Sequence, residues 1–196
     1  MRRFLGAGTI LACVALLACG GGGGGGAVVT PPVPTFQCSD APPPVPADQV
    51  VLRCGAQIAR DVWRIDVVIG VPTTSTDIGG FNFDVVADDA TLLAFVAGSG
   101  QQGELLGQGG ATVLLAAATV PGEPGHLVVG IHRTGGGPGV QGIAGYDRIM
   151  SFRMKALMSG PFGPELLRFE KYEATDSSDQ LIPGITFSDQ LLLSVK

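Results

Sequence analysis

The side chains best suited to chemistry in this 196-residue chain are two histidines and several aspartates. His126 and His132 are an even number of positions apart in one alternating stretch, so on a β-strand they share a face. A metal site or a catalytic base needs a third ligand or a nucleophile nearby, and the surrounding sequence offers neither. We therefore interpret both histidines as polar residues of an exposed strand face.

Two groups of aspartates are candidates for metal binding or catalysis, Asp84 with Asp88 and Asp89, and Asp176 with Asp179. Carboxylate oxygens suit calcium, but neither stretch has the glycine-centred loop of an EF-hand. A glycosidase pair would require facing carboxyls in a cleft, which the sequence does not define. Aspartate is also favoured in turns, where it bonds the local backbone. Turn residues are the favoured interpretation, and we expect no metal and no cofactor.

Sequence motifs for nucleophilic or phosphate chemistry are missing or out of context. The chain has no Gly-x-Ser-x-Gly nucleophile elbow. Residues 137–142 match Gly-x-Gly-x-x-Gly, but they include Pro138 and open no helix, so we predict a hairpin loop there. The sequence therefore predicts a protein that is not an enzyme.

Three aromatic residues, Trp63, Tyr146 and Tyr172, are candidates for stacking against a sugar. Trp63 shares the apolar side of its strand, which predicts a core position. Tyr146 lies in a turn, and Tyr172 has the opposite parity to Phe169, so both tyrosines are expected at the surface. We keep the two tyrosines as binding-face candidates.

Composition points to an all-β domain. Hydrophobic residues make up 45% of the chain and charged residues 15%, with 31 glycines and 14 prolines. Strand-forming residues separated by many turn residues are typical of all-β folds. The formal net charge of −5 argues against nucleic acid as a partner.

The N-terminus has the pattern of a secretory signal. Arg2 and Arg3 precede an apolar run that ends at Ala18, too short to cross a membrane. Residues 16–19, Leu-Leu-Ala-Cys, resemble a bacterial lipobox. That resemblance implies a signal peptide over residues 1–18, lipidation of Cys19, and a lipid-anchored location at the outer membrane or cell surface. An ordinary signal with a fortuitous cysteine is the alternative.

Residues 19–47 are glycine-rich and then proline-rich, which predicts a flexible and then stiff spacer between membrane and domain. Loss of Cys13 with the signal and lipidation of Cys19 leave Cys38 and Cys54 as a pair. Disulfides persist in exported proteins, so we predict that these two are bonded, with a pair of reduced thiols as the alternative.

Period-two patterns fill the chain after residue 47. Apolar residues alternate with Arg64 and Asp66 in residues 62–69, and Phe83 alternates with Asn82 and Asp84 in the next run. Similar runs follow, bounded by turn residues, at 92–97, 112–119, 127–133, 148–157, 166–173 and 185–195. About eight or nine such runs predict an antiparallel β-sandwich over residues 48–196, with Asn82 and Asp84 facing outward.

Three segments resemble conserved blocks of the cohesin domain family. They are IGGFNFDVVADDATLLAF at 78–95, IMSFRMKA at 149–156, and the hairpin at 167–183. The resemblance implies a nine-stranded jelly-roll sandwich with one flat face that binds a calcium-loaded helical dockerin. A single domain behind a lipobox differs from the tandem copies of cellulosomal cohesins.

Together these features predict a lipid-anchored surface protein with a non-catalytic, protein-binding module for scaffolding or adhesion. The alternative is a carbohydrate-binding module that recognises a polysaccharide. The candidate contact residues are Asn82, Asp84, Tyr146 and Tyr172, and the expected partners are the membrane, through the anchor, and a dockerin-like protein or a polysaccharide.

Overall fold

The computed structural model describes residues 35–40, 44–135, 137–157, 160–189 and 191–195. The predicted signal peptide over residues 1–18 and Cys19 lie outside these ranges. Within the described ranges, no helix is long and apolar enough to cross a membrane.

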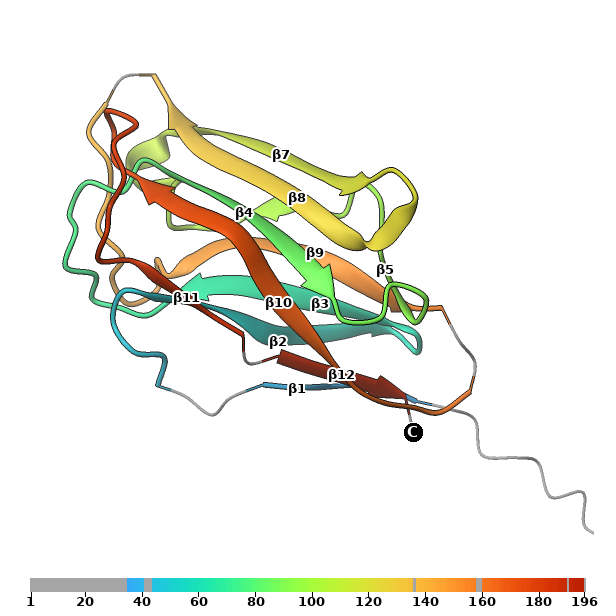
Figure 1. Ribbon diagram of the computed structural model, residues 1–196. Coiled ribbons are helices and arrows are strands. Elements are labelled where there is room, and N and C mark those ends of the chain that lie inside the picture. The colour runs from blue at the N-terminus through green and yellow to red at the C-terminus, as the bar shows by residue number, and fades with distance from the viewer. Residues whose placement is uncertain (1–34, 41–43, 136, 158–159, 190, 196) are drawn as a thin grey trace, which may run out of the picture. The chain divides into compact units, whose positions relative to one another are not determined.

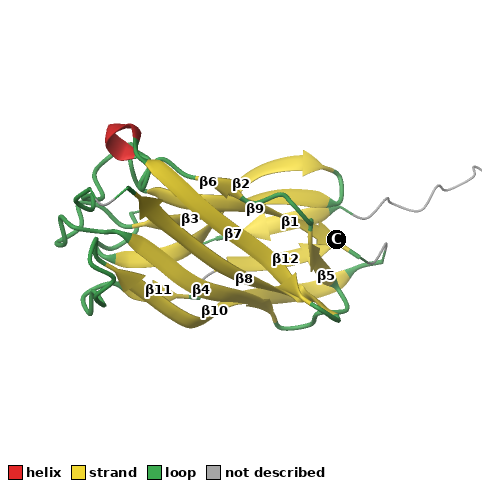
Figure 2. Ribbon diagram, turned by 90° about the horizontal axis from the view of Figure 1, so that it is seen from above, coloured by secondary structure: helices red, strands yellow, loops and turns green. Residues whose placement is uncertain are grey.

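Two β-sheets pack face to face (Figures 1 and 2). Sheet A is antiparallel throughout, and its strands run in the spatial order β1 (Phe36–Ser39), β12 (Leu191–Val195), β10 (Phe162–Thr175), β4 (Gly80–Ala87), β8 (Glu123–Thr134), β7 (Thr112–Val120). Sheet B has the order β11 (Thr186–Ser188), β2 (Gln49–Ala59), β3 (Val62–Ile69), β9 (Arg148–Ala156), β5 (Leu93–Phe95).

Two short elements and one parallel pair complete the described fold. The strand β6 (Gln101–Gln102) also pairs with β9, and a short 3-10 helix spans Gln108–Gly110. The strand β11 runs parallel to β2, whereas the other paired strands are antiparallel. The predicted all-β sandwich is confirmed.

The core lies between the sheets and follows the alternation in the sequence. Phe83 of β4 is buried among apolar side chains of both sheets, and its ring meets that of Phe169 on β10 edge-on, with centroids 5.4 Å apart. Trp63, predicted to be a core residue, packs against the core but is only partly buried. It is half-buried at the sandwich margin, where its indole N–H donates to the Phe36 carbonyl at 2.9 Å.

Strand β1 lies upstream of residue 48, where the sequence analysis placed the start of the domain. It pairs along its whole length with β12, from Phe36 opposite Val195 to Ser39 opposite Leu192. Four residues beside a proline-rich segment are too short to show a period, so only pairing with the far end of the chain defines this strand.

The predicted disulfide between Cys38 and Cys54 is present. Cys38 belongs to β1 in sheet A and Cys54 to β2 in sheet B, so the bond joins the two sheets at one margin. Next to it, the Arg53 side chain pairs with Asp40, whose carboxylate also accepts a hydrogen bond from the Cys54 amide. This margin is therefore closed by a covalent bond and an ion pair together.

We expect the double variant Cys38→Ala/Cys54→Ala to lose about 3 kcal/mol of unfolding free energy, because the bond closes a loop with a sequence separation of 16. Denaturant titration under non-reducing conditions measures the loss. Ser39→Ala, beside the bond and exposed, is the control and should change stability little. Equal stability of the double variant and the parent chain would contradict the stabilising role.

Candidate binding face on sheet A

The outer face of sheet A gathers polar side chains from three adjacent strands. Asn82 and Asp84 on β4 point away from the core, as their alternation with Phe83 predicts. The register sets Asp84 opposite Val128 of β8 on one side and opposite Glu170 of β10 on the other. Residues distant in sequence thus form one surface.

Asp84 lies at the centre of this face and is covered by its neighbours. One carboxylate oxygen is 3.0 Å from His126 Nε2 and 3.1 Å from Lys171 Nζ. His126 Nδ1 in turn lies 2.8 Å from a carboxylate oxygen of Glu123. We name Asp84, His126, Lys171 and Glu123 the charged cluster.

The expectation that Asp84 is an exposed contact residue needs correction, because its side chain is only 7% exposed. The cause is an irregularity in β10 between Glu170 and Glu173, where Lys171 takes a positive φ of 47°. This bulge brings the Lys171 amine over the carboxylate. A buried charge needs partners of opposite sign, so Asp84 anchors the face and its removal would not be neutral.

His126 is held in a position that favours its charged form. Burial, the largest single influence, lowers the pKa of His126, but hydrogen bonds to Glu123 and Asp84 and their negative charges together outweigh it. The result is a pKa above the usual 6.5. The doubly protonated ring can donate from both nitrogens, and each nitrogen faces a carboxylate oxygen.

The second histidine belongs to a separate network on the same face. His132 Nε2 lies 2.9 Å from the Asn82 amide oxygen, and the Asn82 amide donates to Glu173 at 2.7 Å. The ring crosses Gly80, where a Cβ would fall 2.0 Å from His132 Nδ1, so this approach requires glycine. Asn82 is half-buried and ties β8 to β10 across β4.

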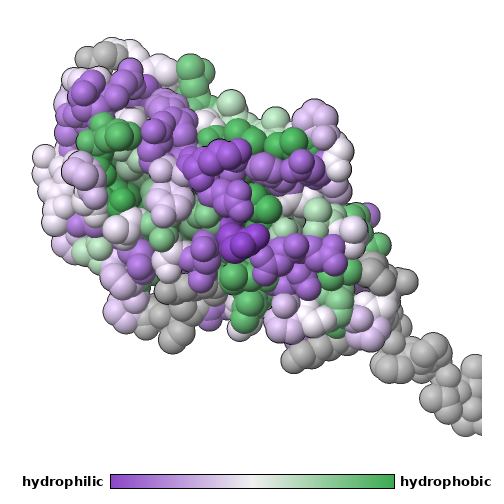
Figure 3. All heavy atoms as spheres, viewed as in Figure 1, coloured by the Kyte–Doolittle hydropathy of each residue, from purple (hydrophilic) through white to green (hydrophobic). Residues whose placement is uncertain are grey.

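An apolar strip borders the polar residues on the β7 side. Val128 is 44% and Leu114 64% exposed, and the small residues Ala116, Ala118 and Gly130 lie next to them on the outer face. Figure 3 shows polar residues across this face and apolar residues along the margin where β7 lies in Figure 1. The face thus combines charge with exposed apolar area, the composition of many protein interfaces.

The two candidate tyrosines do not join this surface. Tyr172 is half-exposed in the β10 bulge and stacks on Phe187 of β11, with centroids 4.6 Å apart. Tyr146 lies in the loop between β8 and β9, in an isolated bridge with Ile143. The described aromatic residues therefore provide no coplanar exposed platform of the kind that stacks on sugars.

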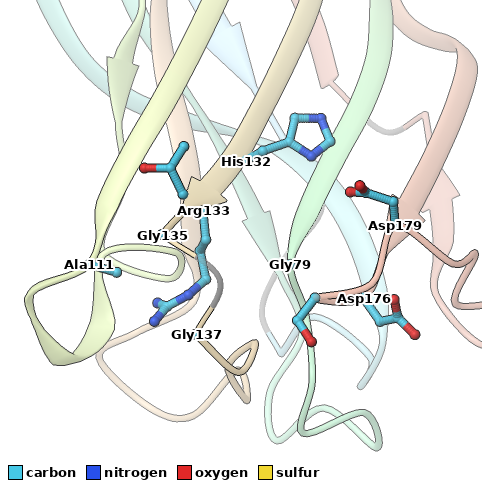
Figure 4. Close-up of a pocket in the computed structure, with 10 residues that line it drawn as sticks. Gly79, Ala111, His132, Arg133, Gly135, Gly137, Asp176 and Asp179 are labelled. Carbon is cyan, nitrogen blue, oxygen red and sulfur yellow. The ribbon is translucent and has the colours of Figure 1, made fainter.

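A polar cavity of about 170 Å³ opens at the end of the sandwich where β8 ends (Figure 4). His132 lies on one wall, and Asp176 and Asp179 come from the loop opposite. Arg133 donates to the carbonyls of Leu106 and Gln108, and Asp176 accepts from two amides of its own turn. These groups already have structural partners.

Sequence and structure agree on the nature of the aspartates in this loop. Asp176 accepts from the amides of Ser178 and Gln180, the local turn bonding expected of aspartate.

In the described part of the chain, no three His, Cys, Asp or Glu side chains converge in a way that could hold a metal ion. Neither the burial of Asp84 nor the raised pKa of His126 could be predicted from the local sequence. Both depend on the register between β4, β8 and β10.

We expect the stability of this protein to depend on pH through His126. Because its pKa is higher in the folded state, its contribution is fully present below pH 6.5 and is lost as pH rises through the folded-state pKa. His126→Gln should remove that part of the slope in unfolding free energies measured by denaturant titration between about pH 5.5 and about pH 8.5. His132→Gln, whose ring faces an amide oxygen, should keep it. An unchanged slope in His126→Gln would contradict the role of the charged cluster.

Comparisons with known proteins support the fold at the level of structure. No family model and no curated protein sequence matches the chain. Among solved structures, it is similar to the second type II cohesin module of the ScaA scaffoldin from Acetivibrio cellulolyticus, with 13% identity and a TM-score of 0.54 over 81% of this chain and 95% of that chain.

Two structures of complexes are also similar. A type II cohesin in a cohesin-X-dockerin complex from the same organism has 15% identity and a TM-score of 0.53 over 71% of this chain and 93% of that one. A type I cohesin in the Coh-OlpC-Doc435 complex from Clostridium thermocellum has 12% identity and a TM-score of 0.51 over 74% and 91%. The chain therefore has a cohesin-like β-sandwich fold.

Proposed function

We propose that this chain is a non-catalytic protein-binding module and that it binds a folded, dockerin-like partner with the outer face of sheet A. The observation that carries the proposal is the charged cluster next to exposed apolar residues. Two of the similar structures are cohesins in complexes with dockerins, which supports a protein partner for this fold.

The charged cluster is suited to orient a partner rather than to react with one. His126 lies two residues before Val128 on the outer face of β8 and bonds Glu123, so a docking partner would meet fixed charges and the apolar strip together. Fixed charges of defined sign favour complementary partners and penalise others, and the apolar patch supplies buried area. Asp84 lies beneath His126 and Lys171 and holds both side chains in place without contacting the partner.

The carbohydrate-binding alternative has less support. Sugar recognition by stacking needs exposed aromatic rings in one plane, whereas Tyr172 is stacked on Phe187 and Tyr146 lies in a separate loop. We retain polysaccharide binding only as an outcome of the test below.

A site-specific photo-crosslinker tests the proposed face. Placed at Val128 in the full chain and activated in producing cells, it should form an adduct with another polypeptide, identified by mass spectrometry. The matched control is the same crosslinker at Arg153, an exposed position on β9 in sheet B. We expect the adduct from Val128 and at least tenfold less of it from Arg153, because only Val128 would lie within reach of the bound partner.

Equal adducts from both positions, or none from Val128, would overturn the proposed face.

Affinity electrophoresis in gels that contain soluble polysaccharides tests the carbohydrate alternative. Slower migration that is lost in Tyr172→Ala would favour the carbohydrate alternative.

We further propose that the chain is exported and anchored at the outer membrane or cell surface through a lipid on Cys19. The support is the lipobox-like segment Leu-Leu-Ala-Cys behind Arg2 and Arg3. The Cys38–Cys54 disulfide fits an oxidising compartment outside the cytosol. Two or more acyl chains anchor a protein stably, whereas one is marginal.

Cys19→Ser should abolish incorporation of labelled palmitate and leave the unprocessed precursor, because acylation precedes cleavage in proteins with this motif. Cys13→Ser, inside the same apolar run, is the control and should label normally. Metabolic labelling followed by gel fluorography measures both. Normal labelling of Cys19→Ser would contradict the anchor.

A further inference from the structure

The strand β7 forms an edge of sheet A that is unusually open to another strand. It pairs with β8 on one side, and with no other strand among those the structure describes. Its sequence, TVLLAAATV, contains no charged residue, no proline and no glycine. In Figure 1 it lies along the upper margin of the sandwich.

Most edge strands carry features that prevent further pairing. Charged side chains, prolines, bulges and very short length are the usual ones. The register of β7 against β8 is continuous from Thr112 to Thr119 and shifts only at Val120. The edge is therefore a regular extended template with no feature that blocks a new strand.

The sequence of β7 is complementary to itself around Ala116. In an antiparallel pair of two β7 strands related by a two-fold axis at Ala116, Leu114 faces Ala118 on the outer side. On the inner side, Leu115 faces Ala117. Large side chains thus oppose small ones on both faces, and no like charges meet, which is favourable for cross-strand pairs.

A cavity beside this edge fits the inner side of such a pair. It measures about 230 Å³ and lies between β7 and the segment that follows β5. Its lining includes Ala117, Leu127 and Phe152. In the paired strands, Leu115 of a second copy would lie opposite Ala117, and its side chain would reach this cavity. Strand addition with side chains in adjacent pockets is a known mode of recognition.

We propose that β7 pairs in antiparallel orientation with β7 of a second copy of this chain, with the two-fold axis at Ala116. The six-stranded sheet A of each copy then joins that of the other copy in one continuous sheet. Backbone hydrogen bonds supply the pairing, and Leu115 of each copy contacts the cavity beside Ala117 of the other. The interface lies along the edge of sheet A and does not depend on the function proposed for its outer face.

Cysteine crosslinking tests both the pairing and its register. In the full chain with Cys13→Ser and Cys19→Ser, purified in detergent, Ala116→Cys places two thiols directly opposite each other. The Cα atoms of opposite residues lie about 4.5–5.5 Å apart, within the range of a disulfide. Ala118→Cys is the matched control, because it is an exposed alanine on the same face whose two copies would be about 13 Å apart.

We expect a covalent dimer of Ala116→Cys under mild oxidation, at least tenfold more than for Ala118→Cys, and a dimer of the parent chain in sedimentation velocity. Unchanged thermal midpoints of both variants show that folding is intact. A monomeric parent chain, equal crosslinking at both positions, or an adduct of Ala116→Cys with a different polypeptide in cells would overturn the proposal.

Discussion

Each sheet buries one face against the other, and this contact determines which side chains lie inside the sandwich and which lie outside. Phe83 and Phe169 meet edge-on on the core-facing side of sheet A, and Phe187 from β11 packs against both rings. A register slip of one residue would turn these rings to solvent and bring Asp84 into the core. The same burial therefore fixes which side chains form the outer face.

The same alternation places Asp84 on the outer face of sheet A. Its negative charge needs partners of opposite sign there. Asp84 is nearly buried, although it points away from the core, because His126 and Lys171 cover it. The bulge in β10 makes this cover and also turns Tyr172 toward Phe187. One irregularity thus fixes the charged cluster and removes an aromatic residue from the face.

The two margins of the sandwich differ in how they are closed. At the margin of β1 and β2, the Cys38–Cys54 bond, the Arg53–Asp40 pair and the indole of Trp63 join the sheets. At the opposite margin, β7 ends sheet A beside a cavity. This second margin, along β7, is the edge that we propose to pair with a second copy.

The all-β class, the cohesin-like resemblance, the disulfide partners and the outward direction of Asn82 and Asp84 could all be predicted from the amino-acid sequence. Each depends on local period, composition or the number of cysteines, which the chain carries without reference to its folded form. Four other features could be recognised only in the folded chain: Asp84 is covered, Trp63 lies at a margin, Phe36–Ser39 forms a strand, and Tyr172 stacks on Phe187. These properties arise between residues far apart in the chain, such as Asp84 and His126 at a separation of 42, and depend on a strand register and a bulge that local patterns do not encode.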